Sequence, residues 1–426
     1  MTVTATRPEA RLVHDSGQLE DERSAGALGL LRLAVTVLLI AGLSVLSHKG
    51  GAVLVIVAIL VMVMLHEFGH FITARWAGMR VTDFFVGFGP TIWSVKRGDT
   101  RYGVKAIPAG GFVRVIGMNS LEEIDPEDEA FTYRSKTYWQ RLRFASAGSL
   151  THFVIAFVLM VVLLAGFGVQ RTTTTLEAVT PGRPAHGAGI RDGDKIVAVN
   201  GKPISDWEEV RDVVTASTGR PVDLKVARGD ETLSFSLTPV DGRTADEKAA
   251  GVAERGVIGI EAAARVVKDS IPGALWHAGF EIKTVTVESA KALFGLVHPD
   301  SVKSYGKQLT KTGPADPQEE NNRLLSPVGV FRIADASAQS GVAAVLWLLV
   351  AINVFVGIFN MLPLPPFDGG HVAVATYEAI VSKLKGRRHM VDMGKLLPVA
   401  YVVILGLMAL SASALWLDIR HPFDLG

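Results

Sequence analysis

The sequence predicts a polytopic α-helical membrane protein that also carries a separate folded insertion of mixed helix and strand. Three observations predict this class. Hydrophobic residues make up 49% of the 426 positions, five apolar runs are long enough to cross a bilayer, and one long stretch between them has the strand and turn pattern of a small α+β domain. A net charge of +1 gives no reason to expect a nucleic-acid partner. The absence of cysteine excludes disulfides and thiolate metal sites.

The chain begins with a polar segment of mixed charge, residues 1–26, which we expect to be disordered. The first two apolar runs, residues 28–46 and 51–74, are expected to form two membrane helices within segment 27–74, because together they are too long for one crossing. We interpret the first run as an uncleaved helix. The apolar core of a signal peptide remains the alternative interpretation.

The second run ends in the motif Leu65-His66-Glu67-Phe68-Gly69-His70-Phe71. Residues four apart share one face of a helix, so His66 and His70 can offer two ring nitrogens to one zinc ion while Glu67 stands beside them. The fifteen residues before the motif contain no charged side chain. Ionisable groups inside a membrane span are costly and usually functional, so this position favours a metal site over a chance match.

Residues 75–143 are expected to form a membrane-associated or cytoplasmic region with a β-hairpin that turns at Arg97-Gly98-Asp99. An open strand edge near a hydrolytic site can hold a substrate in extended form, so Gly110 and Gly111 in this hairpin are candidate substrate contacts. A plain structural hairpin is the alternative. A third span follows at residues 144–168. It contains His152, which either orients substrate or is a satisfied structural histidine.

Residues 172–240 include a segment, residues 181–201, that resembles the core of a PDZ domain of the bacterial protease type. We expect a helix at 207–218 and strands at 222–228 and 232–237. Because PDZ grooves take extended peptides along a sheet edge, a peptide partner is implied, which would serve substrate recognition. A steric gate is the alternative role. Residues 241–340 are expected to be a linker with a strand near 257–260, an amphipathic helix at 271–296 that lies on the membrane, and a loose stretch at 299–323.

The last predicted segment, residues 341–417, holds two spans, followed by a tail at 418–426. The first of these spans ends in Asn360-Met361-Leu362-Pro363-Leu364-Pro365-Pro366-Phe367-Asp368-Gly369-Gly370-His371. Three prolines in four positions cannot continue a helix, so the backbone opens there. Asp368 is the candidate third zinc ligand and Asn360 a candidate substrate contact. His371, three residues on, is a weaker candidate that either supports a metal ligand without binding the metal or is simply packed.

Charge asymmetry predicts the orientation of the chain in the membrane. Residues 75–143 carry eleven Lys or Arg against eight acids, and residues 378–395 carry five against two. Both segments are therefore expected on the cytoplasmic side. The PDZ-like insertion then lies outside the cytoplasm, and the histidine pair lies near the cytoplasmic face of a cell membrane.

Taken in order, L-H-E-F-G-H-F, G-F-G-P, G-G-F-V and N-M-L-P-L-P-P-F-D-G-G-H resemble the site-2 protease family of intramembrane zinc metalloproteases, in its bacterial PDZ-containing branch. The resemblance implies one zinc ion per chain held by His66, His70 and Asp368, Glu67 as general base, and Asn360 as a substrate contact. It also implies a membrane-anchored protein substrate, such as an anti-sigma factor or a remnant signal peptide, cut within its transmembrane segment. Ser149 and His152 stand where the family usually has proline and asparagine, and the run at 28–46 lies outside its usual four-helix core.

Two other classes of function compete with the protease interpretation. A membrane zinc transporter or sensor would also place His and Asp within a helix bundle, but it does not explain Glu67 beside the ligands or the PDZ-like insertion. A catalytically inactive PDZ scaffold is disfavoured because His66, Glu67, His70 and Asp368 are all present.

Overall fold

The computed structural model describes residue 31 and residues 50–118, 122–244, 248, 252–296, 298–310 and 326–420. The chain divides into two compact units, which we call the helical unit (Met1–Leu163 with Pro272–Gly426) and the β unit (Leu164–Ile271). The predicted N-terminal tail, the predicted span at 28–46 apart from residue 31, and the last residues of the predicted C-terminal tail lie outside the described residues.

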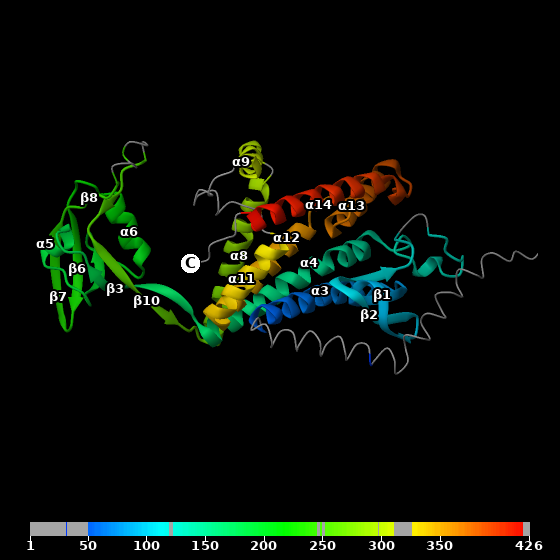
Figure 1. Cartoon of the computed structure of the whole chain (residues 1–426), viewed down its shortest axis with the longest axis horizontal. Coiled ribbons are helices and arrows are strands. Elements are labelled where there is room, and N and C mark those ends of the chain that lie inside the picture. Colours follow the sequence, from blue (N-terminus) through cyan, green and yellow to red (C-terminus); the bar gives the residue numbers. More distant parts are fainter. Residues whose placement is uncertain are drawn as a thin grey trace, which may run out of the picture. The chain divides into compact units, whose positions relative to one another are not determined.

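The helical unit contains the hairpin and the candidate membrane spans, apart from the last residues of one span, 164–167 (Figure 1). Its elements are α3 (Gly50–Trp76), β1 (Val81–Arg97), β2 (Thr100–Val115), η1 (Glu129–Phe131), α4 (Tyr138–Val162), α8 (Ile271–Leu296, which begins at the unit boundary), α9 (Pro299–Thr310), α11 (Pro327–Ser340), α12 (Val342–Asn360), α13 (Asp368–Lys385), η3 (Met393–Leu396) and α14 (Leu397–Arg420).

Four helical segments are long and apolar enough to cross a membrane: Gly50–Trp76, Tyr138–Phe167, Val342–Asn360 and Met393–Arg420. They coincide with four of the five predicted spans. Each forms around a long apolar stretch that no proline interrupts. Pro398 is the second residue of α14, where a helix tolerates proline. Local signals set the ends. Thr137 and Gln140 form a capping box at the start of α4, and α12 ends just before the proline-rich segment.

Helix α4 is the central element of the helical unit, because it packs against α3, α12 and α13. Figure 1 shows α3, α4 and α12 running alongside one another. Two glycines, Gly69 on α3 and Gly148 on α4, allow the two helices to lie close together. A Cβ atom at Gly69 would lie 2.4 Å from the Thr151 hydroxyl oxygen and 2.9 Å from the Ala147 carbonyl oxygen, so only glycine fits.

Strands β1 and β2 form the predicted hairpin, with Arg97 paired to Thr100 across the predicted turn. The hairpin is longer than its sequence pattern indicated. Its register shifts several times, and the left-handed backbone of Gly87 and Gly89 lies within the irregular part. Strand β2 packs on α3, which places the hairpin beside the histidine motif.

The β unit is an antiparallel sheet covered by two short helices. The sheet order is β10-β3-β4-β6-β7, β5 pairs with β4, and β8 pairs with β9. Its elements are β3 (Val169–Val179), α5 (Pro184–Ala188), β4 (Lys195–Val199), β5 (Lys202–Pro203), α6 (Trp207–Thr215), β6 (Val222–Arg228), β7 (Glu231–Leu237), β8 (Val240–Asp241), β9 (Gly256–Val257) and β10 (Ile260–Val267).

The β unit has a hydrophobic core of its own, in which Ile196, Leu224 and Val226 of the sheet pack with Val210 and Val214 of α6. The helix and the two strands predicted between 207 and 237 are present. Strand β10 and the start of β3 lie beyond the predicted range of 172–240, and the two strands pair with each other although about ninety residues separate them. That pairing is non-local, so sequence patterning does not reveal it.

Two parts of the helical unit differ from expectation. Residues 299–310 form helix α9 rather than a loose stretch, because Pro299 and Asp300 supply favourable first-turn residues. The segment before α12 is also helical: α11 begins with Ser326 as its N-cap and is separated from α12 by Gly341. Helix α8 has the predicted bounds. Trp276, Phe280 and Phe294 are exposed on it, while its placement on a membrane surface remains a prediction.

Candidate metal centre

The two motif histidines come from consecutive turns of α3 and face the interior of the helical unit. His66 and His70 are both 6% exposed, whereas Leu65 and Phe68 of the same helix are exposed. The four-residue spacing places both imidazoles on the face that packs against α4. The motif therefore delivers two buried ring nitrogens to one point.

Asp368 reaches the same point from a distant part of the sequence. It is the first residue of α13 and follows the segment that contains Pro363, Pro365 and Pro366. The chain folds tightly here, because a Cβ atom at Gly369 would lie 2.2 Å from the Met361 carbonyl oxygen. Glycine thus allows the proline-rich segment to lie on the first turn of α13, with Asp368 next to the histidines.

The three side chains form the one group of His, Asp or Glu suited to holding a metal ion among the described residues. The Nε2 atoms of His66 and His70 are 3.2 Å apart, and each lies 3.3 Å from Oδ2 of Asp368. Ligands at roughly 2.0–2.2 Å from a tetrahedral zinc ion are separated by roughly 3.3 Å. The separations in this structure therefore fit zinc.

Hydrogen bonding around His70 supports the same conclusion. Its Nδ1 lies 2.8 Å from the Phe144 carbonyl oxygen, which can only accept, so Nδ1 carries the proton and Nε2 keeps its lone pair. Metal-binding histidines commonly donate to a backbone carbonyl in this way. Oδ2 of Asp368 is buried and has no hydrogen-bond donor among the described residues. A cation between Nε2 of His70 and Oδ2 of Asp368 would remove the repulsion between their lone pairs.

We call the group of His66, His70 and Asp368 the metal cluster. Helix α4 contacts this cluster at Gly148. A Cβ atom at this position would lie 2.4 Å from Cε1 of His66 and 2.4 Å from Nε2 of His70. Real Cβ contacts are not this short, so any larger residue would displace the imidazoles. Gly148 is thus part of the metal site, a role that the sequence analysis did not predict for it.

Glu67 is half-buried beside the cluster, between α3 and the hairpin. A Cβ atom at Gly111 would lie 3.2 Å from Cγ of Glu67, so strand β2 passes next to this carboxylate. Gly110 precedes it with a φ of 144°, a value that favours glycine. The structure therefore brings the predicted substrate-contacting glycines to the side of Glu67.

His152 lies next to the cluster, with its ring centroid 5.0 Å from that of His66. Its Nδ1 is 2.8 Å from Oδ1 of Asn353, a fully buried residue of α12. The Asn353 amide donates to the Leu349 carbonyl and contacts the Met62 sulfur, which identifies Oδ1 as the acceptor. Neutral His152 therefore has its proton on Nδ1 and a lone pair on Nε2.

Asn353 is a buried polar residue that sequence reasoning missed. The available signal was an asparagine within the apolar helix α12, which is unusual in a membrane span. Asn360, the predicted substrate contact, is half-buried at the end of the same helix, seven residues later and so on nearly the same face. His371 is half-buried and lies outside the three-residue group, with its ring 6.2 Å from that of Tyr133.

Four apolar helices of spanning length, with a His-His-Asp group and a glutamate among them, define the class of membrane metallopeptidases. The family model described as "Peptidase family M50" matches residues 54–405, and the chain belongs to this family. Among its relatives, zinc metalloprotease Rip1 of Mycobacterium bovis is 34% identical over 417 residues, covering 88% of this chain and 98% of the relative. Metalloprotease MmpA of Caulobacter vibrioides is 28% identical, and the match covers 76% of this chain and 85% of the relative.

The Rip1 zinc metalloprotease of Mycobacterium tuberculosis is likewise 34% identical, over 413 residues. These matches make the chain a zinc metalloendopeptidase with membrane-spanning helices. Among solved structures, the HtrA3 PDZ domain bound to a phage-derived ligand is 33% identical and covers 17% of this chain and 79% of that chain, with a TM-score of 0.15.

Proposed function

We propose that this zinc metalloendopeptidase hydrolyses a peptide bond within the transmembrane segment of a single-span membrane protein. The observation that carries the proposal is the position of Glu67 beside His66, His70 and Asp368, all within or next to apolar helices. Anti-sigma factors and remnant signal peptides are the substrate types that the family resemblance implies. The zinc ligands are assigned to His66, His70 and Asp368.

Each residue of the site has a distinct part in the proposed reaction. A zinc ion held by His66, His70 and Asp368 would supply Lewis-acid chemistry, which activates water and polarises a peptide carbonyl. Glu67 takes the proton from the attacking water and later delivers it to the leaving amide nitrogen. Burial of the site among apolar helices limits the access of bulk water and so strengthens these interactions.

We assign substrate positioning to the hairpin and to α12. A helical substrate hides its peptide bonds, so it must be extended before attack. The strand edge at Gly110 and Gly111 would pair with the extended segment, and Asn360 would hydrogen-bond its backbone. His152, with a lone pair on Nε2, is suited to accept a substrate N–H rather than to donate to an oxyanion.

The replacement Glu67→Gln tests this assignment. The amide is nearly isosteric but cannot accept the proton, so we expect cleavage to fall by at least about 100-fold while zinc content is unchanged. The measurement is cleavage of a labelled single-span substrate in proteoliposomes, with metal analysis of the same preparation. Cleavage at the wild-type rate would remove Glu67 from the mechanism.

We also propose that the β unit is a PDZ domain on the extracytoplasmic side and that it binds an extended peptide. A cavity of about 390 Å³ lies between α6 and residues 256–261, lined by Trp207, Val210 and Val214. Strand β10 is at one edge of the sheet order, so one of its sides is open to strand addition. The excess of Lys and Arg in residues 75–143 supports this orientation.

A membrane-impermeant photo-crosslinking peptide tests both parts of this second proposal. It should label the β unit in right-side-out vesicles and not in inverted ones. Val214→Glu should abolish the labelling, because it places a charge in the apolar cavity. Labelling only in inverted vesicles would reverse the orientation, and labelling that is unaffected by Val214→Glu would place the peptide elsewhere.

A further inference from the structure

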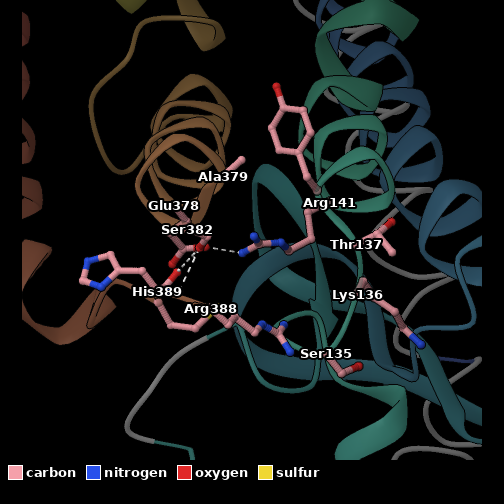
Figure 2. Close-up of a pocket in the computed structure, with 11 residues that line it drawn as sticks. Ser135, Lys136, Thr137, Arg141, Glu378, Ala379, Ser382, Arg388 and His389 are labelled. Carbon is pink, nitrogen blue, oxygen red and sulfur yellow. Dashed lines mark hydrogen bonds and ion pairs between the residues drawn. The ribbon is translucent and has the colours of Figure 1, made fainter. Parts of the chain in front are cut away.

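A buried ion pair joins α4 to α13 away from the metal cluster. Arg141 of α4 and Glu378 of α13 contact each other through Nη1 and Oε2, and their side chains are only 7% and 3% exposed. Figure 2 shows the guanidinium directed at the carboxylate from the neighbouring helix. The other carboxylate oxygen accepts from the Val391 backbone N–H at 2.6 Å. The pair therefore ties together α4, α13 and the segment after α13.

Stability alone does not explain this pair. Taking two charges out of water is expensive, and apolar residues of similar volume are often as stable or more so. The Nε atom of Arg141 is buried and has no hydrogen-bond partner among the described residues, which adds to the cost. Cavities of about 300 and 310 Å³ also adjoin the pair, so the surroundings are not tightly packed.

The ion pair and the metal cluster lie on the same helix faces. On α13, Asp368 is followed at intervals of three or four residues by positions 371, 375 and 378, which share one face. On α4 the corresponding series runs from Arg141 through positions 145 and 148 to His152. Ten residues separate Asp368 from Glu378, or roughly 15 Å along the helix. Helix α13 is thus contacted at two points along one face, by His66 and His70 of α3 at Asp368 and by Arg141 of α4 at Glu378. We call the line of contact between α13 and α4 the seam.

Two features position Asp368: the tight fold of the preceding segment at Gly369 and the seam between α13 and α4. Among the described elements, α13 packs chiefly against α4. A further polar contact along the seam is weak, because the Tyr138 and Thr376 hydroxyl oxygens are 3.4 Å apart. Beside the seam, His371 approaches Tyr133, which precedes α4, at 6.2 Å between ring centroids. The buried ion pair is therefore the directional contact that sets how α13 lies along α4.

We propose that Arg141 and Glu378 are positioning residues, which hold α13 in register on α4 so that Asp368 reaches the zinc ion held by His66 and His70. This inference rests on the proposed function, because it assigns the pair to the geometry of that metal centre. Neither residue touches the substrate or the reacting atoms.

Zinc affinity of the full chain in nanodiscs, measured by competition with a chelator, tests the proposal. Glu378→Gln should weaken zinc binding by roughly 10- to 100-fold, the range seen when residues that support metal ligands are changed. Its cleavage rate should be low at limiting zinc and should recover largely at saturating zinc, because the reacting groups are intact. Asp194→Asn is the matched control. It weakens the ion pair between buried Asp194 and half-buried Arg228 in the β unit and should leave zinc affinity within about two-fold.

A second variant separates positioning from folding. In Arg141→Met/Glu378→Met the burial cost of the charges is removed, so the chain should fold, yet flexible methionines do not restore a directional contact. We expect its zinc affinity to stay at least 10-fold below that of the wild type. Wild-type affinity in this double variant, or in folded Glu378→Gln, would overturn the proposal. A wild-type chain that cleaves without binding zinc would instead overturn the proposed function.

Discussion

At the scale of single residues, the site is defined by where protons and lone pairs lie. The Phe144 carbonyl fixes the proton of His70 on Nδ1, and the Asn353 amide fixes that of His152 on Nδ1. Each histidine thus has a lone pair on Nε2, although the two have different neighbours. His70 directs it toward Asp368, which is the arrangement that a metal ligand needs.

Sequence reasoning predicted His66, His70 and Asp368 as the metal group, and the structure brings them together. The first two are predictable because helical spacing alone brings them together. Asp368 is about 300 residues away, and its assignment rested on the opened backbone before it. Asn353 was missed because a single amide in an apolar helix does not reveal its partner, here His152 of another helix.

At the scale of elements, the close contact of α3 with α4 makes the centre possible. Gly69 on α3 and Gly148 on α4 allow the two backbones to approach. Small residues were visible in the sequence of the third span, but which helix they face is a tertiary property. The same holds for α13, which was expected as part of a spanning region and is instead a separate helix that begins at Asp368.

Gly148→Ala tests the importance of this contact. The added Cβ would lie 2.4 Å from both imidazoles, so the helices or the histidines must shift. We expect at least a 10-fold loss of zinc affinity and a loss of stability of about 1–3 kcal/mol from overpacking. Zinc competition and thermal unfolding measure the two effects.

Gly166→Ala is the control for this substitution, because a Cβ atom at Gly166 meets nothing within 4 Å. It lies in the same candidate span and should leave zinc affinity unchanged. If Gly148→Ala binds zinc as tightly as Gly166→Ala does, the close approach of α4 is not required for the metal centre.

At the scale of the whole molecule, the two units follow different rules of burial. The β unit buries its own apolar core, whereas the spanning helices expose large apolar side chains, such as Val402 and Leu405 on α14. An apolar surface of this kind is expected of helices that contact lipid. The family's membrane character and the four candidate spans agree with this pattern.

Four of the spans were predictable because hydropathy marks membrane helices, and the presence of a small sheet was predictable because turn patterns mark it. The bounds of the β unit were less predictable. Strands β3 and β10 complete its sheet from both ends of the unit, and neither has a local signal that identifies its partner. Helix α11 was also missed, since its moderate length and mixed composition resemble a linker.

The central claim is that His66, His70 and Asp368 hold one zinc ion. Zinc analysis and X-ray absorption of the purified wild-type chain, compared with Asp368→Asn, test it most directly. We predict one zinc per chain with only nitrogen and oxygen ligands at about 2.0–2.2 Å. Asp368→Asn should lower zinc affinity by at least 10-fold, because a neutral amide is a poor zinc ligand. A wild-type chain without zinc, or an Asp368→Asn variant with unchanged zinc content and ligand distances, would contradict the account.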